Sequence, residues 1–102
     1  LVCSKMRDNA CAVSDFSKAV EINPKYAEAY CNRGVAYGQM GDNVREISDY
    51  NKAIELNPKY AEAYCIRGIA YYRKEQVSAA KRDIQKACDL GYDKACDVLD
   101  KL

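Results

Sequence analysis

Cysteine is the reactive side chain that stands out in this sequence, with six copies among 102 residues, whereas histidine is absent. Histidine is the commonest general base and a leading zinc ligand, so its absence removes most familiar catalytic arrangements. No serine or cysteine has a plausible base to activate it, and no glycine-rich phosphate loop is present. We therefore expect no enzyme activity and no cofactor.

The sharpest local cluster of such residues surrounds Cys88 and Cys96, with Asp89 and Asp97 beside them. Zinc sites built on sequence-local ligands need a second pair of ligands at short spacing. No second pair accompanies this one, so we expect no metal site. The many other acidic side chains fall at helical surface positions, which is typical of solvated faces.

The charge balance argues against two classes of partner. Lys and Arg number 16 and Asp and Glu 15, with alternating signs along the chain, whereas nucleic-acid binding needs a clustered basic excess. No apolar run approaches the roughly 20 residues of a membrane span, and no signal peptide or polybasic anchor is visible. The sequence begins with Leu1 rather than Met, so we expect an excised segment.

The elements that must position these residues follow a 34-residue period. The run Pro24–Cys31 recurs letter for letter as Pro58–Cys65, and Lys18-Ala19 recurs as Lys52-Ala53 and Lys86-Ala87. A fixed period of this length indicates a stacked array of short units rather than one globular core. Arrays of short helix pairs mostly bind other proteins, so the period points to a protein or peptide partner.

Proline and apolar spacing divide each period into two helices. Pro24 and Pro58 each follow Asn, where a helix should end and the next can start. Apolar residues at helical spacing then predict helices over 27–39, 44–56, 60–73 and 77–90, and Gly91 has the place of a helix-closing residue. We expect about seven helical segments and no sheet. The single array comprises a partial repeat 1–23, full repeats 24–57 and 58–91, and a terminal capping helix 92–102; the chain opens halfway along its first helix.

The repeats resemble the tetratricopeptide repeat, whose pattern is W-x2-L-G-x2-Y, then A-x3-F, then P over 34 residues. The first full repeat reads Tyr30-x2-Arg33-Gly34-x2-Tyr37, Glu46-x3-Tyr50, Pro58; the second reads Tyr64-x2-Arg67-Gly68-x2-Tyr71, Ala80-x3-Ile84; the leading segment keeps Ala12-x3-Phe16. The resemblance implies an all-α, right-handed α-solenoid of antiparallel helix pairs.

Several motif positions have residues whose size or charge predicts how the helices pack. Gly34 and Gly68 lack a Cβ, so a neighbouring helix can approach closely, which must outweigh the roughly 1 kcal/mol that glycine costs within a helix. Glu46 stands where the pattern has alanine, so either this contact is looser or the carboxylate reaches solvent. Arg33 and Arg67 replace leucine, and we expect their stems to cover apolar surface while the guanidinium groups stay in water.

By resemblance, the first helices of successive repeats line a concave groove that holds a partner peptide or helix. The groove positions in this sequence are Glu28, Asn32, Val35, Gln39, Glu62, Ile66, Ile69, Tyr72 and Arg73. In family members an amide at the place of Asn32 grips the ligand backbone; the alternative is a common solvent-exposed asparagine.

One subclass of the family clamps the acidic C-terminus of heat-shock chaperones with Lys, Asn and Arg. Of that set only Asn32 is matched, because Glu62 and Ile66 occupy basic positions. Glu28 and Glu62 would also repel a carboxylate. We therefore predict against binding of chaperone tails.

The segment from Lys86 to Asp97 resembles secreted, cysteine-rich helical repeats related to tetratricopeptides. That resemblance implies a disulfide between Cys88 and Cys96 across the turn. The alternative is two small thiols kept reduced in a cytosol. The cytoplasm is favoured, and a bridged pair would instead indicate a secreted or periplasmic protein.

A second function remains open beside the non-enzymatic interaction scaffold. The N-terminal apolar face around Val2, Met6, Phe16 and Val20 could meet the C-terminal tail of another copy, which would give end-on self-association. Leu102, bulky where the pattern has glycine, disfavours a seamless continuation. Changes at Ile69 and Tyr72 should impair groove binding, and changes at Phe16 or Leu99 should impair end stacking.

Overall fold

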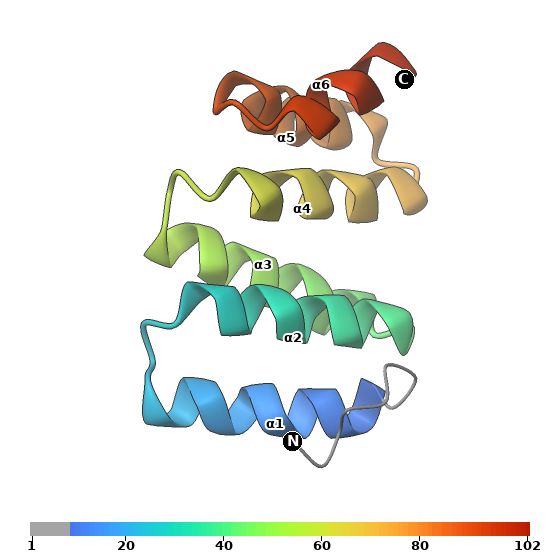
Figure 1. Cartoon of the computed structure of the whole chain (residues 1–102). Coiled ribbons are helices and arrows are strands. Elements are labelled where there is room, and N and C mark those ends of the chain that lie inside the picture. Colours follow the sequence, from blue (N-terminus) through green and yellow to red (C-terminus); the bar gives the residue numbers. More distant parts are fainter. Residues whose placement is uncertain (1–8) are drawn as a thin grey trace. The chain divides into compact units, whose positions relative to one another are not determined.

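The computed structural model describes residues 9–102, and this part of the chain is entirely helical apart from short connections (Figure 1). The helices are α1 (Asn9–Ile22), α2 (Ala27–Gln39), α3 (Asn43–Leu56), α4 (Ala61–Arg73), α5 (Val77–Asp89) and α6 (Asp93–Asp100). Helices α2, α3, α4 and α5 agree closely with the four predicted ranges, and six helices are described where about seven helical segments were expected. The half-helix expected at the chain start falls on residues 1–8, outside the described part.

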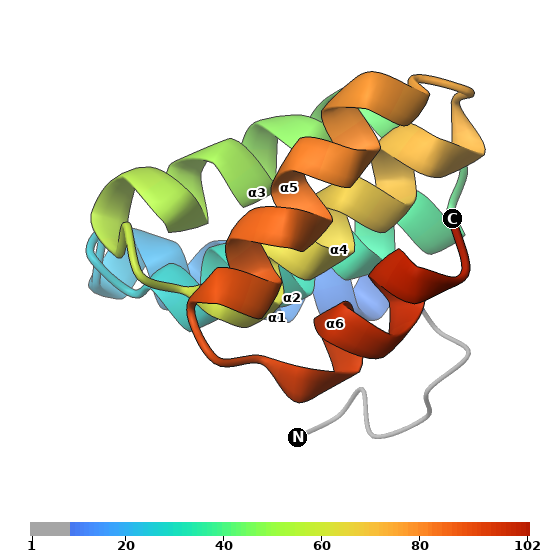
Figure 2. The same ribbon diagram turned by 90° about the horizontal axis from the view of Figure 1, so that it is seen from above.

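The chain divides into two compact units, one up to Leu56 and one from Asn57 to Leu102. In the first unit α2 packs against both α1 and α3. In the second, α5 packs against both α4 and α6 (Figure 2). Successive helices of each unit run antiparallel because the connections are only a few residues long. The expected repeat boundaries at 23/24, 57/58 and 91/92 fall in such connections.

The connections follow from their residues. The side-chain oxygens of Asn23 and Asn57 each accept a hydrogen bond from the backbone N–H two residues later, at 3.2 Å, which turns the chain before the next helix. Gly91 lies just after the end of α5, in the connection to α6. Its φ is +100°, a left-handed conformation that glycine adopts without steric cost. The predicted role of Gly91 is therefore confirmed.

Close approach at glycine governs the packing within each helix pair. A Cβ built on Gly34 would lie 2.7 Å from Cε1 of Tyr50, and one on Gly68 would lie 2.7 Å from Cγ1 of Ile84. Tyr50 and Ile84 are each only 1% exposed. The predicted role of the two glycines is confirmed, since any side chain there would push α3 or α5 away.

Glu46 corrects a sequence expectation. It is buried, at 2% exposure, and its Oε2 accepts a hydrogen bond of 2.9 Å from the Tyr50 hydroxyl. The contact is therefore neither loose nor solvated. Room for the carboxyl comes from Gly38, because a Cβ there would lie 2.6 Å from the carboxyl carbon of Glu46. The second unit has Tyr72 and Ala80 at the two equivalent positions.

The second unit buries a cluster of Cys65, Ile84, Ala87 and Ala95, against which Val98, Leu99 and Leu102 pack. Through these contacts the short helix α6 and the residues after it pack against apolar side chains of both α4 and α5. Within residues 9–102 no helix is both long and apolar enough to cross a membrane.

Candidate functional site

Three predicted groove residues of α2 meet in one pocket. Asn32, Val35 and Gln39 line an open cavity of about 330 Å³ in the first unit. The remaining lining residues are Asn9, Ala12, Phe16 and Ala36, so the pocket lies between α1 and α2. Glu28 is exposed on the first turn of α2 and does not line it.

The predicted residues of α4 form a row in the second unit. Glu62, Ile66, Ile69 and Arg73 follow the helical spacing i, i+4, i+7, i+11, which places them along one face. Ile69 is 41% exposed and Tyr72 48%, while Ile66 is half-buried. Apolar side chains exposed beside a charged group are a common feature of protein-binding surfaces. The α2 and α4 sets belong to different units, and one groove built from both stays a prediction.

Each unit also contains an arginine–aspartate pair that the sequence reasoning missed. Arg33 donates from Nε and Nη2 to the Asp49 carboxylate at 2.8 and 2.7 Å, and from Nη1 to the Ser17 hydroxyl at 3.2 Å. Arg67 donates to Asp83 at 2.7 Å from the same two atoms. The side chains of Arg33 and Asp49 are only 19% and 7% exposed, so the expectation of solvated guanidinium groups was wrong.

Aromatic rings complete these pairs. The Arg33 guanidinium carbon lies 5.4 Å from the Tyr30 ring centre and 5.8 Å from that of Tyr37. Arg67 lies 5.6 and 5.8 Å from the rings of Tyr64 and Tyr71. Such stacking is typical of cation–π contacts. The missed signal was the recurrence of Arg and Asp 16 residues apart in both repeats.

The pKa shifts of Arg33, Arg67 and Cys65 are consistent with side chains that stabilise the packing of the helices. The hydrogen bonds to Asp49 and Asp83 raise the pKa values of Arg33 and Arg67, so both arginines stay charged. Burial raises the pKa of the Cys65 thiol, and nearby Glu62 adds to this effect. The raised pKa of Cys65 favours the thiol over the thiolate, which is the nucleophilic form.

A disulfide joins Cys88, at the end of α5, to Cys96 in α6, with the two Cα atoms 4.8 Å apart. Buried Cys31 and Cys65 carry thiols. Cys11 is also disulfide-bonded, which the sequence reasoning missed.

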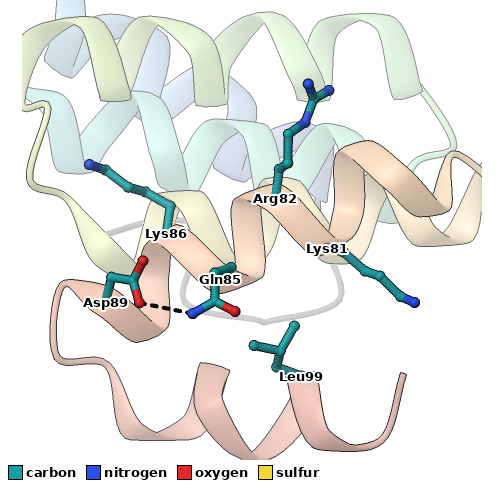
Figure 3. A pocket seen from close by; sticks show the side chains of 6 residues that line it. All are labelled: Lys81, Arg82, Gln85, Lys86, Asp89 and Leu99. Atoms are coloured by element: carbon teal, nitrogen blue, oxygen red, sulfur yellow. Dashed lines mark hydrogen bonds between the residues drawn. The ribbon is translucent and has the colours of Figure 1, made fainter.

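A larger open pocket of about 560 Å³ lies between α5 and α6, lined by Lys81, Arg82, Gln85, Lys86, Asp89 and Leu99. Gln85 Nε2 donates to Asp89 Oδ1 at 2.8 Å. Figure 3 shows the three basic side chains pointing away from one another. They do not converge on a single point, so the pocket has the character of a solvated surface. Residues 9–102 contain no group of three or more His, Cys, Asp or Glu that could hold a metal ion.

Comparison with protein families gives two matching models, both of the same repeat family. A family model described as TPR repeat matches residues 8–41 and 47–75. A second, described as tetratricopeptide repeat, matches residues 27–60. No curated protein matches the chain in a sequence comparison.

Solved structures supply similar folds. The Arabidopsis OM64 TPR domain is 27% identical with a TM-score of 0.87, over 93% of this chain and 79% of that one. The first TPR of Spaghetti (RPAP3), bound to the HSP90 peptide SRMEEVD, is 27% identical with a TM-score of 0.80, over 87% and 72%. A MamA structure is 32% identical with a TM-score of 0.80, over 88% of this chain but 53% of its own length.

Proposed function

Because the chain belongs to the tetratricopeptide repeat family, we propose that it is a non-enzymatic interaction scaffold that binds a partner peptide or helix through the exposed faces of α2 and α4. The observation that carries the proposal is the exposure of Ile69 and Tyr72 on α4, at 41% and 48%. Large apolar side chains gain free energy when a partner removes them from water, at roughly 25 cal/mol per Å² of apolar surface.

The chemistry around these side chains restricts the partner. Exposed Glu62 precedes Ile66 and Ile69 on the same face of α4, and exposed Glu28 occupies the matching place on α2. An acidic tail such as the HSP90 peptide bound to the Spaghetti domain would meet like charge at both positions. The proposed partner segment is therefore apolar with basic or neutral flanks.

The test is a crosslinked pull-down from lysate of the source cells, read by mass spectrometry. Proteins captured by the wild-type chain should be lost with Ile69→Glu/Tyr72→Ala. They should be retained with Val77→Glu, because Val77 is also 41% exposed but begins α5. Circular dichroism verifies that both variants keep their helices. Equal capture by all three chains would refute the role of the α4 face.

Two further experiments separate this proposal from chaperone-tail binding and from end-on self-association. Synthetic SRMEEVD should compete with none of the captured partners, and competition would reinstate chaperone-tail binding. End-on self-association predicts instead that the chain recovers mainly itself, and that Phe16→Ala or Leu99→Ala abolishes this recovery.

A further inference from the structure

Helix α5 carries a group of basic side chains that the chain itself does not neutralise. Lys81, Arg82 and Lys86 are exposed and line the open pocket between α5 and α6. Within residues 9–102 none of these three side chains forms an ion pair, whereas Arg33 and Arg67 are each bound to an aspartate. We call Lys81, Arg82 and Lys86 the basic face of α5. Its charges are open to an anionic group from outside the chain.

Leu99 gives the same pocket an apolar wall. It is half-buried, and Figure 3 shows its side chain pointing from α6 toward α5. Among the described residues that line the pocket, Asp89 alone is acidic, and it accepts a hydrogen bond of 2.8 Å from Gln85 Nε2. Three basic residues against one acidic residue give the lining a net positive charge. The pocket therefore offers an anionic ligand both positive charge and an apolar contact.

The spacing of the basic face indicates the shape of its ligand. Figure 3 shows the three basic side chains pointing away from one another, so they do not enclose a compact anion. Arg82 and Lys86 lie four residues apart, about 6 Å along the helix axis. In an extended peptide, alternate side chains project from the same side about 7 Å apart. A segment with several carboxylates can therefore contact both basic side chains at once.

The equivalent face of α3 lacks this charge. Counted by the 34-residue period, the basic face corresponds to Ile47, Ser48 and Lys52. Ser48 and Lys52 are exposed, although further helices follow α3 in the chain. Lys52 Nζ is paired with Glu55 Oε1 at 3.1 Å. Exposure of this face is therefore common to both repeats, one of which is followed by further helices, and the unpaired positive charge is particular to α5.

We propose that the basic face of α5 and Leu99 bind an acidic peptide segment of another protein, which has a leucine-sized apolar side chain among its carboxylates. The carboxylates pair with Arg82 and Lys86, and the apolar side chain removes Leu99 from water. This site goes beyond the proposed function, because it shares no residue with the predicted positions on α2 and α4. It also prefers the opposite charge, since Glu28 and Glu62 repel an acidic segment.

A peptide suits the pocket better than two other anionic partners. Nucleic acids and anionic membranes select proteins with a clustered basic excess. This chain has 16 basic and 15 acidic residues, so its positive face is small. The apolar wall formed by Leu99 also matches a peptide side chain.

The test is an anisotropy titration of the full chain with the fluorescein-labelled, amidated peptide Gly-Glu-Glu-Leu-Glu-Glu-Gly. Saturable one-to-one binding with a Kd below about 1 mM is expected. Lys81→Gln/Arg82→Gln/Lys86→Gln should weaken the binding about tenfold or more, because several exposed ion pairs are lost together. The matched control removes the same charge from three exposed lysines outside the pocket and should leave the affinity unchanged, in Lys18→Gln/Lys25→Gln/Lys59→Gln. Circular dichroism verifies that both variants keep their helices.

Peptide variants and one further chain variant complete the test. Peptides with the cores Gln-Gln-Leu-Gln-Gln and Glu-Glu-Ala-Glu-Glu should each bind more weakly than the original, and Ile69→Glu/Tyr72→Ala should bind the original peptide unchanged. The proposal is overturned by a Kd weaker than about 1 mM, by equal effects of the two triple variants, or by full affinity of the alanine peptide. Loss of binding in Ile69→Glu/Tyr72→Ala would place the peptide on α4 and overturn it as well. Phosphatidylserine vesicles that bind through the basic face, without peptide binding, would assign that face to a lipid surface instead.

Discussion

At the scale of single residues, the arginine–aspartate pairs hold the helix pairs together by charge where the family pattern uses an apolar contact. Asp49 is 7% exposed, so its carboxylate has lost most of its water and depends on Arg33 for compensation. Replacing a buried ion pair as a whole is often neutral, whereas removing one partner leaves an uncompensated charge. Each arginine is therefore needed at its position because it compensates the charge of a buried aspartate.

The first prediction separates these two effects. Arg33→Leu, which restores the family residue, should lower the free energy of unfolding by about 3–5 kcal/mol because Asp49 is left buried and unpaired. The double change Arg33→Leu/Asp49→Leu should recover most of that loss. Urea unfolding followed by circular dichroism measures both. A double variant as unstable as the single one would show that the pair itself, and not the orphaned charge, supplies the stability.

At the scale of the helices, close packing at glycine sets how near α5 lies to α4. A Cβ on Gly68 would lie 3.0 Å from the backbone oxygen of Ala80, an atom that cannot rotate away. Gly68→Ala should therefore destabilise by about 1–2 kcal/mol, even though alanine gains about 1 kcal/mol in helix propensity. Thermal unfolding measures the change, with exposed Ser78→Ala as the control. A Gly68→Ala variant as stable as wild type would contradict the close approach.

The connection between α4 and α5 contains a local strain. Glu75 has a φ of +64°, whereas its equivalent in the first repeat is Gly41, at +82°. The left-handed conformation costs a residue with a side chain about 1–2 kcal/mol. Glu75→Gly should therefore raise the free energy of unfolding by about 1 kcal/mol, and Gly41→Glu should lower it similarly. Urea unfolding midpoints of both variants measure the change. Midpoints equal to that of the wild type in both Glu75→Gly and Gly41→Glu would contradict a strained Glu75.

The attachment of α6 depends on the link between Cys88 and Cys96. Closing this short loop should stabilise the second unit by about 2–3 kcal/mol on the chain-entropy model. Alkylation of the unreduced, denatured chain should modify Cys31 and Cys65 but neither Cys88 nor Cys96. The Cys88→Ser/Cys96→Ser variant should show faster hydrogen exchange in α6. Alkylation of Cys88 and Cys96 without reductant would instead support reduced thiols and a cytosolic location.

The helices were predictable from sequence because proline, glycine and apolar spacing act locally. The ends of α2 and α4 fell within one residue of the predicted ranges for that reason. Glu46 and Arg33 were misjudged because their surroundings come from the other helix of the pair: Gly38 makes the room for Glu46, and Asp49 neutralises Arg33. A motif read along one helix does not contain this information. The α1–α2 pocket was likewise only half predicted, through its α2 residues.

At the scale of the whole molecule, the remaining question is whether copies associate. The α1–α2 pocket is lined in part by the amides Asn9, Asn32 and Gln39, and Leu102 stands where the repeat pattern has glycine. We therefore expect sedimentation to give a mass that is independent of protein concentration. A mass that rises with concentration and returns to the monomer with Phe16→Ala would favour end-on assembly.

The exchange of Gly38 and Glu46 for Tyr72 and Ala80 has a consequence for how a duplicated chain finds its fold. Identical segments such as Pro24–Cys31 and Pro58–Cys65 allow each first helix to compete for the other's second helix during folding. Pairing α4 with α3 would direct the Tyr72 side chain into the space of the Glu46 carboxyl. Pairing α2 with α5 would leave a void between Gly38 and Ala80. One substituted position per helix thus favours the pairing of α2 with α3 and of α4 with α5 over the two exchanged pairings.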